Sequence, residues 1–303
     1  MSASNPPLND AEASGGSSEA HYKFTVSYDG TSFKGFQRQT AGVRTVQGEL
    51  EKAFRSVGWT GTAIRGAGRT DSGVHASGQV ISARLCWNHP PAALVGALNV
   101  SLPPEIAIQD AERVRSDFDP RRDAVSRTYR YRILIHPIRQ PLSERNGWRL
   151  SAVPDFEKLR ETGAVFLGTH DFASFGSAPE KGGSTVRRIY RSRWLRSAET
   201  PEKLFFYEVE ANGFLYRMVR RLVYLQAMAA LGFLPGDSLR EALESGRPLQ
   251  NAVHAADLLL RAKLPGVVGS PIAAASHPGF TMIPGRKRAF FKSAFRRVAP
   301  FAF

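Results

Sequence analysis

Glycine spacing in the segment Gly66–Val80 constrains the fold of this chain more than any other feature of its sequence. Glycines stand at positions 66, 68, 73 and 78. Glycine permits sharp backbone bends and a close approach of the backbone to a ligand, because it has no Cβ atom. Asp71 lies among these glycines, and an apolar run begins at Val80. The segment therefore predicts a tight turn that presents one carboxylate and leads into a strand.

The chemistry of this turn depends on the environment of Asp71. Arg69 stands two residues before it, and a nearby guanidinium favours the ionised form of a carboxylate. An ionised aspartate on a constrained turn is a candidate nucleophile. The same residue in a Thr-Asp-Ser-Gly sequence can instead cap the turn and do no chemistry. The rest of the chain has to decide between these two interpretations.

Composition points to an anionic partner. The chain has 303 residues, enough for one large or two modest folded units, and a formal net charge of +14. Such a charge favours nucleic acid over a membrane, because no strongly amphipathic basic helix stands out. Cys86 is the single cysteine, which excludes a disulfide within the chain and a cysteine-cluster metal site. The seven histidines show no ligand spacing, so we expect no metal. We expect no membrane partner either.

Residues 1–20 are rich in Ser, Ala and Gly and contain neither Lys nor Arg. This composition lacks the basic region of a signal peptide and the arginine-rich helix of a transit peptide. No apolar run approaches the length needed to span a membrane. We therefore expect a cytoplasmic protein with a disordered tail over residues 1–20.

Hydrophobic periodicity predicts strands and helices in both halves of the chain. Strands are expected over 21–28, 80–85, 106–108, 128–135, 185–195 and 204–209, with a shorter one around Ala63. Helices are expected over 46–57, 90–98, 156–166 and 214–231. This mixture predicts an α+β fold with helices on one face of each sheet.

Six motifs follow one another along the chain. One covers residues 67–80, and the other five are Tyr28–Gln39, Val46–Ala53, Phe118–Arg121 with Arg127–Tyr131, Phe166–Phe175 and Ala211–Arg220. In this order they resemble the motifs of the tRNA pseudouridine synthase A family, in which residues 67–80 correspond to A-G-R-T-D-A-G-V-H-A-x-G-Q-V, with Ser72 here where alanine is commoner. The resemblance covers roughly residues 21 to 225 and fades after about residue 250. There, Leu264–Ile272 stands in place of the family's closing strand with a poor fit.

The resemblance implies a fold that periodicity could not have indicated. It is the pseudouridine synthase fold, with two ferredoxin-like halves, mixed and mainly antiparallel sheets, and a central basic cleft. We place the halves at residues 21–112, which carry the Asp71 turn, and 113–275. A basic, divergent tail over residues 276–303 follows.

The reaction that the resemblance implies converts uridine to pseudouridine. The bond from ribose C1′ to uracil N1 breaks and the base rejoins through C5, which is redox-neutral and needs no cofactor. Asp71 is the expected carboxylate; it could attack C1′, add to C6 or remove the C2′ proton, and all three roles need it ionised. The resemblance implies that Arg220 pairs with it. From the residues alone, the favoured interpretation is that Arg217, Arg220 and Arg221 form a solvated basic face of a helix.

Further site residues follow from the same resemblance. Tyr129 is expected to stack on the uracil, since an aromatic face offsets part of the energy needed to unstack a base. As residues of one strand face, Tyr129 and Tyr131 could also be plain core. Arg69 could hold Asp71 in place or, as the resemblance implies, enter the space left by the everted base. His75 is interpreted as structural.

The expected function is that of a tRNA pseudouridine synthase acting at positions 38–40, in the anticodon stem-loop, as a homodimer. Phosphate contacts are expected from an arginine group: Arg121, Arg122, Arg127 and Arg130. Two alternatives stay open. One is an RNA-binding protein of the same fold whose altered C-terminal segment has cost it the reaction. The other is a hydrolase that uses Asp71 on a different substrate.

Overall fold

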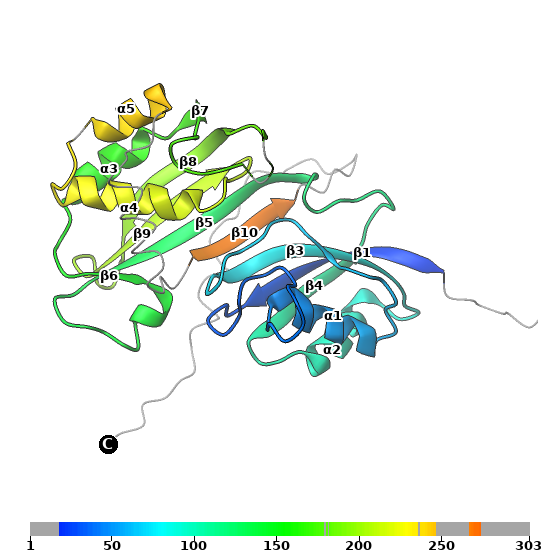
Figure 1. The fold of residues 1–303 in the computed structure, drawn as a ribbon. Helices are drawn as coiled ribbons and strands as arrows, with labels where there is room; N and C mark the ends of the chain where they lie inside the picture. Colours follow the sequence, from blue (N-terminus) through cyan, green and yellow to red (C-terminus); the bar gives the residue numbers. More distant parts are fainter. Residues whose placement is uncertain (1–17, 179, 181, 236, 247–266, 274–303) are drawn as a thin grey trace, which may run out of the picture. The chain divides into compact units, whose positions relative to one another are not determined.

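One mixed, mainly antiparallel sheet runs through the described part of the protein (Figure 1). The computed structural model describes residues 18–178, 180, 182–235, 237–246 and, as backbone, 267–273. Its strands are β1 (Glu19–Tyr28), β2 (Arg65–Gly66), β3 (His75–Cys86), β4 (Ile106–Arg113), β5 (Ala124–Ile135), β6 (Trp148–Leu150), β7 (Gly168–Asp171), β8 (Val186–Arg196), β9 (Leu204–Ala211) and β10 (Val267–Ala273). The principal strand order is β4-β1-β3-β10-β5-β9-β8-β7, with β2 paired to β3 and β6 to β5. The expected α+β class is confirmed.

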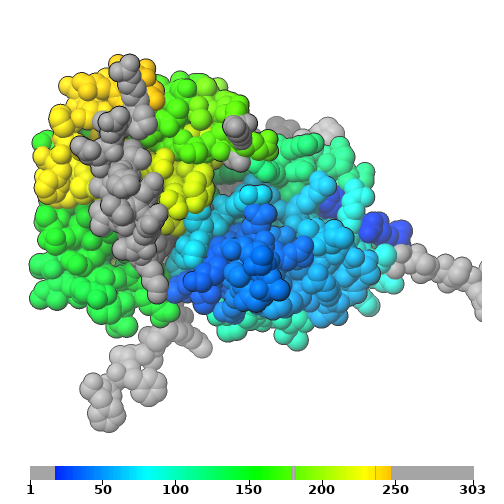
Figure 2. Space-filling model, viewed as in Figure 1, coloured from blue at the N-terminus to red at the C-terminus, as the bar shows by residue number. Residues whose placement is uncertain are grey.

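The N-terminal strands share their core with two helices, α1 (Val46–Ser56) and α2 (Pro91–Ser101). Phe24 of β1 packs edge-on against Phe54 of α1, with ring centroids 4.9 Å apart. The two helices lie on the same face of β1, β3 and β4 (Figure 1). The segment around α1, drawn in blue, covers part of this core in the space-filling view (Figure 2).

A second core forms where β5, β8 and β9 meet α3 (Phe156–Ala164), α4 (Met218–Ala230) and α5 (Ser238–Ser245). Tyr131, Ile133, Tyr207 and Val209 point into it because alternate residues of a strand share a face. One residue of the N-terminal half, Val74, also belongs to this second core. The turn that carries Asp71 is therefore anchored in the core of the other half.

Strand β10 connects the two sets of strands. It runs parallel to β3 and antiparallel to β5, so Gly269 is paired with Ala76 on one side and Tyr129 on the other. The segment whose sequence fits the family's closing strand poorly thus still forms a strand in this central place. Only one strand separates the start of β3 from the part of β5 that holds Tyr129.

Most predicted elements are confirmed with shifted ends. Helix α1 begins after Thr45, whose side chain accepts a hydrogen bond from the Gly48 amide, and ends at Ser56 before Gly58 with φ 83°. The predicted strand around Ala63 lies instead at β2. The predicted strand over 80–85 begins earlier, at His75, and β1 begins at Glu19. The expected tail over 276–303 lies outside the described residues, as does most of the disordered tail expected over 1–20, although residues 19 and 20 belong to β1.

The start of α4 is a correction. We expected a helix from Phe214, but α4 begins at Met218. The Tyr216 amide donates to the Ser177 carbonyl oxygen at 2.9 Å, and Arg217 has φ 59°. A left-handed residue interrupts an α-helix, so tertiary contacts delay the helix by one turn.

Candidate active site around Asp71

The Asp71 turn rests on the backbone of residues 30–36. The Phe36 amide donates to the Thr70 carbonyl oxygen at 3.0 Å, and a Cβ atom at Gly30 would lie 1.9 Å from the Val74 carbonyl oxygen. Gly35 has φ 94°, a conformation that favours glycine. The glycines of this segment are therefore needed for two backbones to approach each other below Asp71.

Ser72 and its neighbours add polar contacts to this packing. The Ser72 hydroxyl donates to the Phe33 carbonyl oxygen at 3.1 Å, and the Gly73 amide lies 3.4 Å from the same oxygen. The Thr70 and Tyr28 hydroxyls are 2.8 Å apart. Residues on both sides of Asp71 are held, which leaves its side chain as the projecting group of the turn.

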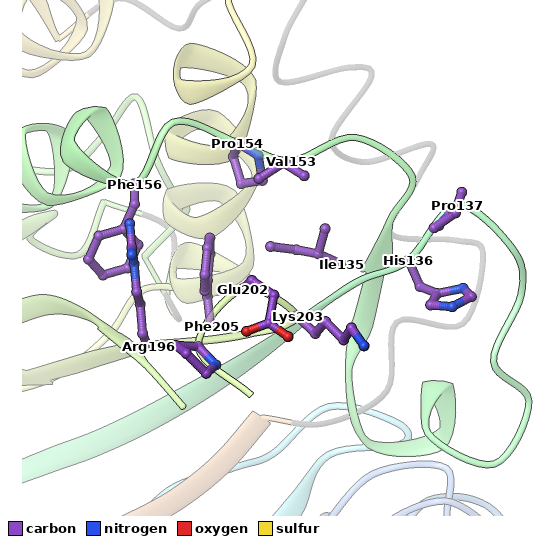
Figure 3. Close-up of a pocket in the computed structure, with 11 residues that line it drawn as sticks. Ile135, His136, Pro137, Val153, Pro154, Phe156, Arg196, Glu202, Lys203 and Phe205 are labelled. Carbon is purple, nitrogen blue, oxygen red and sulfur yellow. The ribbon is translucent and has the colours of Figure 1, made fainter. Parts of the chain in front are cut away.

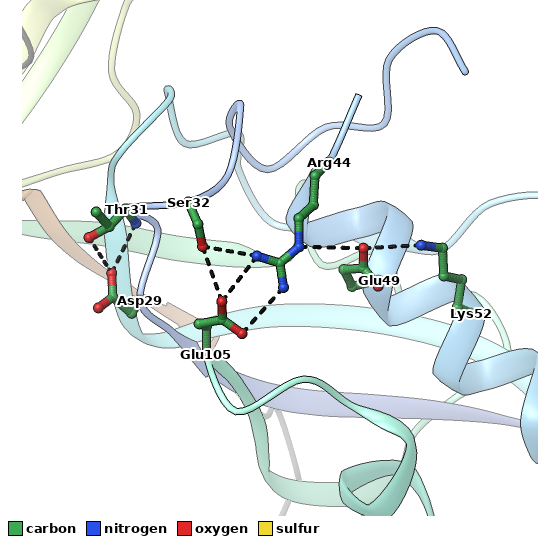
Figure 4. A network of polar contacts seen from close by, with 7 residues as sticks. All are labelled: Asp29, Thr31, Ser32, Arg44, Glu49, Lys52 and Glu105. Carbon is green, nitrogen blue, oxygen red and sulfur yellow. Dashed lines mark hydrogen bonds and ion pairs between the residues drawn. The ribbon is translucent and has the colours of Figure 1, made fainter. Parts of the chain in front are cut away.

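A polar network holds the supporting segment itself (Figure 4). Arg44 binds both carboxylate oxygens of Glu105, at 3.0 and 3.3 Å, and its guanidinium lies 4.5 Å from the centre of the Phe33 ring. Asp29 accepts hydrogen bonds from the amide and hydroxyl of Thr31. Because Arg44 is an exposed residue, we regard this network as fixing the geometry of the segment rather than as a large source of stability.

His75 faces this network and not the open side of the turn. Its Nδ1 lies 3.0 Å from Asp29 Oδ1 and 3.3 Å from the Gly30 nitrogen. Burial raises the pKa of Asp29, but the Thr31 hydrogen bonds and the charge of His75 outweigh it, so the net shift is downward. These contacts agree with the structural interpretation of His75.

Arg220 is the cation next to Asp71. Its Nε lies 3.4 Å from Asp71 Oδ2, and its Nη2 lies 3.4 Å from the Ser72 carbonyl oxygen. The Arg220 side chain is 11% exposed and that of Asp71 is 39% exposed. The pair thus consists of a largely buried guanidinium and a carboxylate that a ligand from solvent can reach.

Tyr129 belongs to the same neighbourhood. Its ring packs edge-on against Phe214, with centroids 5.0 Å apart, and it is partly buried. Burial and the charge of Asp71 raise the pKa of Tyr129 to about 12, although Arg127 acts in the opposite direction. Asp71 and Arg220 are therefore in contact, and Tyr129 lies within reach of the charge of Asp71; the three come from a loop, a helix and a strand far apart in the sequence.

The other predicted residues differ in exposure and in the partners that they bind. Arg69, Arg121 and Arg122 are exposed, and no ion pair joins Arg69 to Asp71 in the described part of the chain. Arg130 forms an ion pair with Glu208, which also binds Arg193 at 2.6 Å. Arg127 donates to backbone carbonyl oxygens at 2.8–3.2 Å.

Sequence reasoning missed two residues that shape the site. Gln79 is buried, and its Nε2 donates to the Gly68 carbonyl oxygen at 2.6 Å, three residues before Asp71. A glutamine in an apolar strand was the available signal, because a buried amide requires a partner. Phe214, the aromatic neighbour of Tyr129, was interpreted only as the start of a helix.

A cavity of about 460 Å³ lies elsewhere, at the end of β5 (Figure 3). Ile135, Val153, Phe156 and Phe205 give it apolar walls, and the Arg196 guanidinium lies 4.2 Å from the centre of the Phe156 ring. None of the predicted site residues lines it. Within the described residues, no group of three or more His, Cys, Asp or Glu side chains could hold a metal ion, and no helix could span a bilayer.

Comparisons with known proteins identify the family. A family model described as tRNA pseudouridine synthase matches residues 25–121 and 164–260, more than half of the chain. A tRNA pseudouridine synthase A from Methylacidiphilum infernorum is 38% identical over 229 residues, which cover 76% of this chain and 88% of that protein. The protein of that name from Geobacter sp. is 41% identical over 198 residues, covering 65% and 78%. That from Agrobacterium fabrum is 38% identical over 227 residues, covering 74% and 84%.

Both matched stretches contain a member of the ion pair: Asp71 lies in the first and Arg220 in the second. The mixed α+β sheet with helices packed on it agrees with the pseudouridine synthase fold. The chain therefore belongs to the tRNA pseudouridine synthase family, and the protein is an isomerase of that family.

Proposed function

We propose that this protein converts uridine to pseudouridine at positions 38–40 of tRNA, in the anticodon stem-loop and in the cytoplasm, with Asp71 as the catalytic carboxylate. The observation that carries this proposal is the Asp71–Arg220 pair, with Nε and Oδ2 3.4 Å apart, whose carboxylate remains 39% exposed. Family membership supports the reaction class. The choice of positions 38–40 rests on the motif resemblance.

The reaction is balanced without a redox partner. The C1′–N1 bond breaks, a C1′–C5 bond forms, N1 gains a proton and C5 loses one. Asp71 acts on the ribose or the base while ionised, and Arg220 stabilises that charge at 3.4 Å. A largely buried guanidinium is suited to this task because it holds its charge and its direction.

The target uracil has to leave its stack to reach a carboxylate on the protein. Tyr129 provides an aromatic face beside Asp71, and stacking on such a face is worth about 1–3 kcal/mol. Arg69 is exposed and makes no ion pair with Asp71 in the described chain. We propose that the Arg69 side chain enters the space that the everted base leaves in the RNA.

Phosphate contacts would supply most of the affinity for tRNA. We assign them to a basic cleft that includes Arg121 and Arg122, whose side chains are exposed. Arg127 and Arg130, also expected from the sequence, both lie on β5 and add positive charge there. Their guanidinium groups bind acceptors of the protein itself. The resemblance further supports a homodimer, which light scattering of the protein with and without tRNA would test.

The test is a pseudouridine assay on an unmodified tRNA transcript with uridine at 38, 39 or 40. Wild type should form pseudouridine at these positions, and Asp71→Asn should form none while it binds the transcript with unchanged affinity. Asp110→Asn is the matched control, because Asp110 is exposed on β4 and its replacement removes the same charge.

Three other outcomes would overturn the proposal. Absence of product from wild type with tRNA binding retained would favour a non-catalytic RNA-binding protein. Release of free base or phosphate would favour a hydrolase. Product formed only outside positions 38–40 would refute the assignment to the anticodon stem-loop but keep the reaction.

A further inference from the structure

One guanidinium contacts three separate segments around the candidate active site. Arg127 donates from Nε and Nη2 to the Ala67 carbonyl oxygen, at 3.2 and 2.8 Å. Its Nη1 donates to the Asn212 carbonyl oxygen at 2.9 Å, and Nη2 also donates to that of Arg121 at 2.8 Å. These four hydrogen bonds engage all three nitrogens of the guanidinium.

Two of the three contacted segments lead to groups assembled at the site, and a third group lies on the strand of Arg127 itself. Ala67 opens the turn that presents Asp71, and its own amide donates to the Val80 carbonyl oxygen at 2.9 Å. Asn212 follows β9 and begins the connection to α4, which carries Arg220. Arg127 itself precedes Tyr129 by two residues on β5. One side chain therefore links the segments that carry a carboxylate, a cation and an aromatic ring.

The packing around the guanidinium leaves little freedom. A Cβ atom at Gly68 would lie 3.8 Å from Arg127 Nε, so the turn rests directly on this side chain. Gln79 holds the next carbonyl along the turn, that of Gly68, at 2.6 Å. The turn is thus fixed at two successive carbonyl groups, by Arg127 from β5 and by Gln79 from β3.

Arg127 has no carboxylate partner among the residues that the structure describes, which sets it apart from Arg130 with its Glu208. Burial lowers the pKa of Arg127, and the charges of Arg121 and Arg187 act in the same direction. Tyr129 acts in the opposite direction, and the hydrogen-bond acceptors of this cation in the described part of the chain are backbone carbonyl oxygens. A planar group with several N–H donors in fixed directions can satisfy separated carbonyls in a way that an ammonium group cannot.

We infer that Arg127 is a positioning residue for the isomerisation: it sets the Asp71 turn against Tyr129 and the start of α4. The inference rests on the proposed function and assigns Arg127 a role other than phosphate binding. Misplacement of reacting groups by about 1 Å can lower a rate about 100-fold. The effect should therefore fall on turnover and not on affinity for tRNA.

The test compares Arg127→Lys and Arg127→Gln with wild type in single-turnover assays on the tRNA transcript. Both variants should lose about 100-fold in the rate of pseudouridine formation, with the dissociation constant for tRNA changed less than about twofold. The control is Arg160→Lys, because Arg160 is exposed on α3 and its ion-pair partner among the described residues is Glu157. It should match wild type.

Hydrogen exchange supplies a second measurement that needs no activity. In Arg127→Lys, the amides of residues 66–71 should exchange faster, while those of β8 and β9 keep their protection. A purely structural role would speed exchange throughout both cores, and it would overturn the inference. This measurement on the conservative variant still decides the matter if Arg127→Gln does not fold.

The remaining outcomes separate the inference from the proposed function. Wild-type turnover in Arg127→Lys would show that charge suffices and overturn the positioning role. A weaker affinity with unchanged turnover would assign Arg127 to phosphate binding. Inactive wild-type protein would refute the proposed function and the inference with it, whereas active wild type with normal variants would refute the inference alone.

Discussion

Arg220 Nε lies 3.4 Å from Asp71 Oδ2, although the two residues come from opposite halves of the chain. Arg220 lies in the first turn of α4. Asp71 lies on a turn that continues to Val74, and Val74 is anchored in the core beside α4. The pair depends on two elements that pack on each other, so its geometry is a property of the whole fold.

Replacement of Arg220 should therefore lower turnover. Arg220→Ala removes the cation next to the carboxylate, and we expect a loss of about 100-fold in kcat, equivalent to about 2.7 kcal/mol. Arg220→Lys restores the charge but not the contact to the Ser72 carbonyl oxygen, so it should recover only part of the rate. Steady-state assays with tRNA measure both. Arg240→Lys, at an exposed position of α5, is the control, and equal rates for Arg220→Ala and wild type would contradict the ion pair's role.

Tyr129 should act through its ring. Tyr129→Ala should lower kcat about 10-fold, because stacking worth about 1–3 kcal/mol is lost, while affinity for tRNA stays nearly unchanged. Tyr129→Phe should stay within a few-fold of wild type. The pKa of about 12 keeps the phenol neutral, so the pH–rate profiles of wild type and Tyr129→Phe should coincide up to about pH 10. Divergence below that pH would indicate that the hydroxyl takes part.

The free energy of unfolding should depend on pH through the carboxyl group of Glu208. Burial raises the pKa of this carboxyl, but its bonds to Arg130 and Arg193 outweigh burial and lower it below the ordinary 4.5. Its contribution is therefore complete above about pH 5 and is lost as pH falls through the lower, folded-state value. Glu208→Gln should cost about 2 kcal/mol at pH 7, and the difference from wild type should shrink towards pH 3.

Urea unfolding at several pH values measures this difference. Glu161→Gln is a suitable control, because Glu161 is exposed on α3. A constant difference between Glu208→Gln and wild type across that range would show that the carboxylate contributes only its shape.

Two glycines should respond to alanine in opposite directions. A Cβ atom at Gly30 would meet the Val74 carbonyl oxygen at 1.9 Å, so Gly30→Ala should displace the Asp71 turn and destabilise the protein by about 3 kcal/mol or more. Gly96 lies in α2 with nothing within 4 Å of a Cβ position. Gly96→Ala should therefore stabilise by about 0.5–1 kcal/mol. Thermal unfolding separates the two, and similar melting temperatures would contradict the close approach at Gly30.

Local signals explain which elements could be predicted from the sequence. The α1 helix has an N-cap threonine, apolar spacing and a terminal glycine, and it was predicted within one residue of its end. The start of α4 was predicted wrongly, because the contact of Tyr216 with Ser177 depends on a distant segment. Strand β10 lies where the sequence fits the family's closing strand poorly, and its pairing with β3 and β5 also depends on distant segments.

The residues of the candidate site also differ in whether local sequence signals could predict them. The glycine pattern indicated a constrained turn at Asp71, which is a local property. The partnership with Arg220 came from family resemblance, since no spacing rule connects residues in different halves. Gln79 carried a signal that was missed, a glutamine in an apolar strand, but its partner at Gly68 and the carbonyl contacts of Arg127 could not be predicted, because backbone acceptors leave no mark in a sequence.

The central place of β10 bears on how the protein is made. Its partners β3 and β5 leave the ribosome long before residues 267–273 do. Until then each nascent half presents an unpaired strand edge, and such edges are prone to pair with the wrong chain. Completion of the sheet therefore waits for the synthesis of residues 267–273, and a chain whose translation stops before codon 267 would contain both halves without the strand that joins them.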